Sequence, residues 1–193
     1  LVISAVPLVR GVFQHGAFTA GDTLGTASAL AAFSFGVPAY VLIKVLTPGF
    51  YARQDTKTPV RLAMISMLVN FFGNLTLIWS MGHVGVAVAT AISAWVNMGL
   101  LYAVLHRRGQ LQLEARLRAK VLRIIAAGAA MGVALWLMNP LADRYMDGSL
   151  MQRVIALAVL CGGGALVYGA AALLFRAYTI PELRTQLSRK KPG

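Results

Sequence analysis

Long apolar runs alternate along the chain with short polar segments that are rich in Lys and Arg. A helix needs roughly 20 apolar residues to cross a hydrocarbon core of about 30 Å. Runs of that length occur at about residues 27–47, 62–81, 84–105, 121–141 and 154–175. The opening residues, LVISAVPLV, have the character of a further span of which only the end is present. The pattern predicts an all-α fold, a polytopic membrane helix bundle with five full transmembrane helices and a truncated one at the N-terminus.

The composition also indicates a membrane protein. The chain is 58% hydrophobic and 12% charged, and its mean hydropathy is +0.70. Such a chain is too apolar for an ordinary soluble domain. Because neither an initiating Met nor a basic segment precedes an apolar run, no secretory signal peptide is expected. We interpret the chain as the C-terminal fragment of a larger membrane protein.

The basic residues indicate which ends of the spans face the cytoplasm. The formal net charge is +12, but Lys and Arg lie between apolar runs rather than along one face, so no nucleic-acid partner is expected. They gather in alternate loops, within residues 53–61, 107–123 and 176–191, whereas the opposite side has Arg10, Arg144 and Arg153. Under the positive-inside rule the first set is cytoplasmic, and so is the C-terminus.

Motifs of enzymatic or metal chemistry are missing from the sequence. It has no Gly-rich phosphate loop followed by Lys, and its three His residues lack metal-ligand spacing. None of the six acidic residues lies within a predicted span, so a proton relay through an intramembrane carboxylate is not expected. We therefore predict no metal site and no cofactor.

Amides and hydroxyls are the polar groups that enter the predicted spans. Asn70 and Asn74 stand four residues apart and share one helix face. Thr90 and Asn97, seven apart, share a face of the next span, which also has Ser93. Two interpretations remain open, since such residues either form hydrogen bonds between helices or line a polar cavity that takes part in substrate binding or gating.

Pro and small residues predict local features of the helices. Pro38 cannot donate to the Ser34 carbonyl, so a kink eased by Gly36 is expected there. Asp22 is expected to be the N-cap of the first full span. Small residues give the last two spans smooth faces, which favour helix packing or border a groove for a lipid chain; they are Gly128, Gly132, Gly162, Gly163 and Gly164.

Three stretches together carry a family resemblance. They are KVLTPGFYARQDTKTPV at residues 44–60, GVFQHGAFTA at residues 11–20, and the pair Asn74-Leu75. In these stretches the chain closely resembles the MurJ (MviN) lipid II flippases of bacteria, in the multidrug, oligosaccharidyl-lipid and polysaccharide exporter superfamily. Specific motifs support the resemblance over about residues 1–106, and beyond them it rests on the number and spacing of the spans.

The resemblance implies a division of the chain. By the resemblance, the truncated opening span would be the ninth span of a family member. Residues 1–106 would then form second-lobe helices, the end of span 9 and spans 10–12, with the cytoplasmic loop at 48–61. Residues 107–120 would be a basic cytoplasmic linker, 121–175 the last two helices with a lipid-tail groove, and 176–193 a basic cytoplasmic tail.

The resemblance also implies a function. The whole protein would be a transporter, not an enzyme, in the bacterial cytoplasmic (inner) membrane. It would move lipid II, an undecaprenyl-pyrophosphate-linked peptidoglycan precursor, from the cytoplasmic to the periplasmic leaflet by alternating access, in cell-wall synthesis. Its partners would be lipid II, membrane lipids and the missing N-terminal lobe of the same protein, which would hold most of the anion-binding arginines.

Two alternatives to this function remain. The apolar spans also suit an exporter of another polyprenyl-linked oligosaccharide. A non-transporting membrane scaffold of cell-wall synthesis is the third possibility, because the basic tail RTQLSRKKPG suits binding to anionic lipid or to a protein partner.

The loop PGFYARQDTKTP, residues 48–59, has three possible roles: topology, structural gating, and substrate contact. Pro48-Gly49 is expected to end one helix, and Pro59 to lie in the first turn of the next. Arg53 and Lys57 suit binding of the pyrophosphate, with Asp55 paired to one of them when no substrate is present. Because topology alone does not require this order of residues, Gln54 belongs to the same candidate site.

Overall fold

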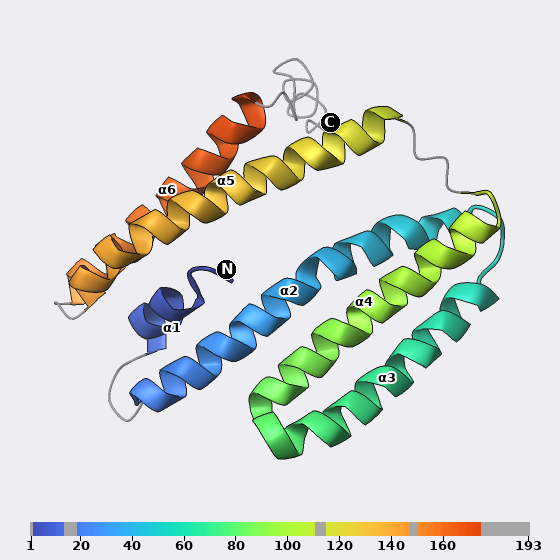
Figure 1. Ribbon diagram of the computed structural model, residues 1–193, viewed down its shortest axis with the longest axis horizontal. Coiled ribbons are helices and arrows are strands. Elements are labelled where there is room, and N and C mark those ends of the chain that lie inside the picture. Colours follow the sequence, from blue (N-terminus) through green and yellow to red (C-terminus); the bar gives the residue numbers. More distant parts are fainter. Residues whose placement is uncertain (1, 14–18, 111–114, 147–149, 175–193) are drawn as a thin grey trace, which may run out of the picture. The chain divides into compact units, whose positions relative to one another are not determined.

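The structure is a computed structural model of the chain, and it describes residues 2–13, 19–110, 115–146 and 150–174. Throughout these residues the regular elements are helices (Figure 1): α1 (Ala5–Phe13), α2 (Ala20–Tyr51), α3 (Lys57–Met81), α4 (His83–Arg107), α5 (Ala115–Met146) and α6 (Leu150–Leu174). The five helices from α2 to α6 are long and apolar enough to span a membrane. The predicted all-α membrane bundle with five full spans is confirmed.

The chain forms two compact units, Leu1–Gln112 and Leu113–Gly193. In the first unit, α4 lies between α2 and α3 and packs against both, while α1 packs against α2 (Figure 1). In the second unit, α5 packs against α6. The division between the units falls inside residues 107–120, the stretch predicted as a linker, and α5 already begins at Ala115.

Small residues allow α2 and α4 to approach closely. Ala39, Ala87 and Ala91 are almost completely buried. A Cβ atom added at Gly36 would lie 3.2 Å from the Cα atom of Ala91. Membrane helices pack through such smooth faces because little side-chain entropy is lost and backbone contact is extensive. Gly36 therefore contributes to the contact between α2 and α4.

Pro38 lies inside α2, and the helix continues through it. The indole Nε1 of Trp95 donates a hydrogen bond of 3.1 Å to the carbonyl oxygen of Phe35, one turn before this Pro. A neighbouring helix thus supplies a polar contact beside the position where Pro removes a donor. The kink expected at Gly36 and Pro38 stays a prediction.

The N-terminus of α2 differs from the prediction. Thr19, rather than Asp22, is the N-cap, and its hydroxyl accepts a hydrogen bond of 3.3 Å from the Asp22 backbone N–H. The Asp22 carboxylate accepts one of 2.9 Å from the Thr19 backbone N–H. Asp22 thus occupies the third helical position of a capping box. Because polar capping residues define this end, α2 begins well before the apolar run at residue 27.

The second unit is an antiparallel helix pair. Leu135 of α5 packs with Ala156 and Leu160 of α6, whereas Ala127 packs with Ala171 and Ala172. The candidate glycines fall into two groups here. A Cβ at Gly163 or Gly164 would meet side chains of α5, whereas one at Gly128 or Gly162 would meet nothing within 4 Å. Gly132 is half-buried. A lipid groove on this unit stays a prediction.

Candidate functional site

The turn that follows α2 is fixed by its own backbone. The N–H of Asp55 donates to the carbonyl oxygen of Phe50 at 3.1 Å, and the N–H of Gln54 donates to that of Tyr51 at 2.9 Å. Gln54 has a positive φ of 58°. These are the two hydrogen bonds and the left-handed residue of a Schellman motif, which satisfies the last carbonyls of a helix. Residues 50–55 therefore have a defined conformation.

The helix before this turn is longer than predicted. Pro48 and Gly49 were expected to end it, but both lie inside α2, which ends at Tyr51. The prediction is wrong because Pro removes one donor while the bonds beyond it persist, as in the 2.9 Å hydrogen bond from the Ala52 N–H to the Pro48 carbonyl oxygen. The helix stops where the left-handed Gln54 directs the chain away.

Asp55 caps the next helix. Its Oδ1 accepts a hydrogen bond of 3.0 Å from the Thr58 backbone N–H, and its Oδ2 accepts one of 2.7 Å from the Thr58 hydroxyl. Thr56 precedes α3 with helical backbone angles and makes no side-chain cap bond, so Asp55 performs this role. Pro59 lies in the first turn of α3, as predicted, where its missing N–H costs no helical bond.

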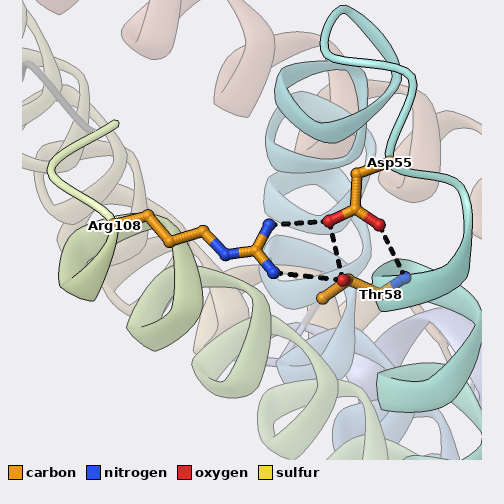
Figure 2. Close-up of polar contacts among 3 residues, drawn as sticks. All are labelled: Asp55, Thr58 and Arg108. Carbon is orange, nitrogen blue, oxygen red and sulfur yellow. Dashed lines mark hydrogen bonds and ion pairs between the residues drawn. The ribbon is translucent and has the colours of Figure 1, made fainter.

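Arg108, at the end of α4, binds the same carboxylate (Figure 2). Its Nη1 donates to Asp55 Oδ2 at 2.6 Å, and its Nη2 donates to the Thr58 hydroxyl at 3.2 Å. The guanidinium carbon also lies 5.9 Å from the ring centroid of Phe50. Hydrogen bonds from Arg108, and then from Thr58, lower the pKa of Asp55 to about 2, because they stabilise its charged form.

The expected partners of Asp55 were wrong. Asp55 pairs with Arg108 rather than with Arg53 or Lys57. The side chains of Arg53, Gln54 and Lys57 are exposed on the turn and at the start of α3. The pairing follows from geometry, since α4 packs against both α2 and α3 and brings its C-terminal end to their connection.

An apolar cluster lies beneath the turn. Phe50 is 1% exposed and packs with Leu101 and Leu105 of α4. Helix α4 ends in a second Schellman motif, in which the Gln110 N–H donates to the Leu105 carbonyl oxygen at 3.0 Å and Gly109 has a φ of 64°. Phe50 and Leu105 hold the same position in their two motifs. Their contact therefore places the C-terminal ends of α2 and α4 side by side.

A polar cavity of about 280 Å³ lies among α2, α3 and α4. Asn70 Nδ2 donates hydrogen bonds of 3.3 Å to the hydroxyls of both Thr90 and Ser93. Asn74 Nδ2 donates to Asn70 Oδ1 at 3.0 Å. The remaining polar lining comes from Tyr40, Ser66 and Asn97. The sequence left two alternatives for these side chains, namely hydrogen bonding between helices and the lining of a cavity. Both occur.

Several buried oxygens at and beside this cavity have no partner in the described part of the chain. They are Ser66 Oγ, Asn74 Oδ1 and Asn97 Oδ1. Buried polar atoms are nearly always hydrogen-bonded in folded proteins, so these oxygens suit donors from water, from a ligand or from a further helix. Ser66 was not among the predicted lining residues, although it stands four residues before Asn70 and therefore shares its face.

The fold and these two polar regions define the class, a polytopic helical membrane protein. The model of the family "Lipid II flippase MurJ" matches residues 1–156. The chain therefore belongs to the MurJ lipid II flippase family.

Individual relatives agree with this assignment. The chain is 41% identical over 175 residues to a "Probable lipid II flippase MurJ" of Vibrio cholerae, covering 90% of this chain and 33% of that protein. It is 33% identical over 190 residues to one of Rickettsia prowazekii, covering 98% of this chain and 37% of that protein. A solved structure, "Lipid II flippase MurJ, inward closed conformation", matches with a TM-score of 0.67 and 25% identity, covering 91% of this chain and 34% of that one. The chain thus spans about a third of the length of these relatives.

Proposed function

We propose that the chain forms part of a lipid II flippase, which moves the undecaprenyl-pyrophosphate-linked precursor from the cytoplasmic to the periplasmic leaflet by alternating access. The match of residues 1–156 to the family carries this proposal. The protein acts in the bacterial inner membrane, with its C-terminus in the cytoplasm. The distribution of Lys and Arg supports that orientation.

The polar cavity is the proposed substrate-binding or gating region of this part. Its buried oxygens at Ser66 and Asn97, and that of Asn74 beside it, support the proposal, because they suit hydroxyl and amide donors of a sugar-peptide headgroup. Asn70 holds α3 to α4 at the same level through Thr90 and Ser93. Substitutions here act on substrate binding and on helix packing together.

The turn between α2 and α3 is the proposed cytoplasmic gate. Arg53 and Lys57 are exposed and carry the positive charge that attracts a pyrophosphate. Gln54 and Asp55 set the path of the backbone between them. Residues 1–106 belong to the second lobe in this proposal. They act together with an N-terminal lobe that supplies most of the anion-binding arginines.

The last two helices, residues 121–175, are proposed to hold the lipid tail. The open space beside Gly128 and Gly162 supports a smooth wall on that pair, whereas Gly163 and Gly164 serve the contact between α5 and α6. Residues 107–120 connect the two parts in this division, with α5 already beginning at Ala115, and residues 176–193 are a basic tail.

Growth complementation tests the function. The aligned third of the Vibrio cholerae relative is replaced by these 193 residues, and the chimera is expressed in cells depleted of their own flippase. Growth equal to that given by the unaltered relative supports the proposal. Failure of an expressed and membrane-inserted chimera contradicts it. Competition between lipid II and other lipid-linked sugars for the purified chimera separates it from an exporter of a different oligosaccharide.

A further inference from the structure

One basic side chain joins the turn between α2 and α3 to a different helix. Arg108, which follows α4, donates to Asp55 at 2.6 Å and to the Thr58 hydroxyl at 3.2 Å. Its guanidinium also lies near the ring of Phe50, the buried residue at which the Schellman motif of α2 begins. Arg108 therefore contacts residues on both sides of the turn, and Figure 2 shows its contacts with Asp55 and Thr58.

The arrangement of the helices gives this contact a mechanical consequence. Helix α4 packs extensively against α2 and α3, which make little contact with each other. The turn is the covalent connection between α2 and α3, so it spans the end of α4. A side chain from α4 that binds the turn fixes three helices to one another at this end of the unit.

The turn requires such support because of its backbone. Gln54 has a φ of 58°, a conformation that is sterically unfavourable for a residue with a Cβ atom. The carboxylate of the neighbouring Asp55 accepts three hydrogen bonds, two from Thr58 and one from Arg108. The bonds from Thr58 are local to the start of α3. Arg108 thus supplies a polar link from the turn to the end of α4, beside the packing of Phe50 on Leu105.

We propose that Arg108 is a positioning residue, which acts through Asp55 and Thr58 to hold the turn in one orientation and so fixes where Arg53 and Lys57 are presented. The assignment rests on the proposed function only in so far as Arg53 and Lys57 serve transport. Arginine suits this role because its planar guanidinium reaches the carboxylate and the hydroxyl with two separate nitrogens, whereas lysine supplies a single ammonium.

Arg107 provides a matched control. It directly precedes Arg108, carries the same charge on the same helix end, and is exposed. R107Q and R108Q remove the same charge from the same loop, so an effect on membrane topology is common to both. An effect of R108Q alone belongs to the contact with Asp55. R108K keeps the charge but loses the two-point contact.

A spin label reports the order of the turn directly. It is attached at Ala52→Cys, an exposed position within the turn, in a full-length protein that carries this chain and has no other cysteine, with Cys161→Ala. We expect R108Q to raise the mobile fraction of the label by about twofold to fivefold, as suits loss of a partly exposed ion pair. R107Q should leave it unchanged, and R108K should lie between. Equal label mobility in R108Q and the parent overturns the assignment.

Lipid II translocation by the same proteins gives the second readout. We expect R108Q to slow translocation at a protein level equal to that of R107Q, with partial recovery in R108K. Unchanged translocation by R108Q in an active parent overturns the link from the turn to transport. If the parent itself does not translocate lipid II, the proposed function fails, and the label still decides whether Arg108 positions the turn.

Discussion

Gly85 of α4 lies directly against the backbone of Leu77 in α3. A Cβ atom at Gly85 would overlap the Leu77 carbonyl oxygen and would lie 2.6 Å from its carbonyl carbon. Since both neighbours are backbone atoms, no side chain can move aside. The short connection between α3 and α4, where Gly82 has a φ of 57°, therefore depends on the absence of a side chain at Gly85.

Gly85→Ala is expected to destabilise the protein by about 1–3 kcal/mol, because the overpacked helices must separate. Gly99→Ala on the same helix is the control, since a Cβ there would meet nothing within 4 Å. The melting temperatures of the two detergent-solubilised variants test the prediction. A Gly85→Ala protein as stable as Gly99→Ala would show that the contact with Leu77 does not constrain this turn.

Asn70→Ala is expected to lower stability by about 0.6 kcal/mol or somewhat more, as is typical of hydrogen bonds between membrane helices. It removes both bonds from α3 to Thr90 and Ser93 and leaves Asn74 without its acceptor. Thr76→Ala is the control, because that hydroxyl bonds to carbonyls of its own helix. Equal stability of the two variants in equilibrium unfolding would argue against a structural role for the cavity network.

Gln54→Gly is expected to stabilise the protein by up to about 1 kcal/mol, because glycine adopts a positive φ without steric cost. Ala52→Gly, two residues earlier, is expected to destabilise it by about 0.5–1 kcal/mol, since its φ is helical at −58°. Thermal unfolding of both variants measures the difference. Destabilisation by both substitutions would contradict the left-handed conformation of Gln54.

The stability of the folded protein should depend on Asp55 at acidic pH. Because the folded-state pKa of Asp55 is lowered from 3.8 to about 2, its contribution is fully present above pH 3.8 and is lost as pH falls toward 2. In this window the unfolded state binds the proton more readily than the folded state does, so the stability of the folded protein decreases as the pH decreases. Asp55→Asn should flatten this part of the pH profile of the melting temperature.

R108Q should flatten the same window partially, since Arg108 is the largest cause of the lowered pKa and Thr58 still donates to Asp55. Both variants are compared with the parent between pH 2 and 5 at one ionic strength, because salt screens a partly exposed pair. Identical slopes in all three proteins would mean that the ion pair does not contribute to folding.

Hydropathy predicted the five spans because a bilayer requires long apolar helices, whatever their neighbours. It did not predict their ends. Thr19 begins α2 through a capping box, and Gln54 redirects the chain after it, so local hydrogen bonds set both limits. The two prolines at the boundaries of the loop also differ in outcome. Pro59 lies in the first turn of α3, as predicted, whereas Pro48 lies inside α2 instead of ending it.

The candidate cavity was predictable in part. Helical spacing placed Asn70 and Asn74 on one face, but which helix that face meets depends on the packing of α3 against α4. The partner of Asp55 was not predictable, because 53 positions separate it from Arg108. The available signal was weak: both residues lie in loops that the distribution of charge assigned to the same side of the membrane.

Lipid II translocation is the most direct measurement of the central claim. The chimera that carries these 193 residues is reconstituted into vesicles with labelled lipid II, and the label exposed in the opposite leaflet is followed over time. Translocation at a rate comparable to that of the unaltered Vibrio cholerae relative is the predicted result. A correctly inserted chimera that binds lipid II but never exposes it in the opposite leaflet would contradict the account.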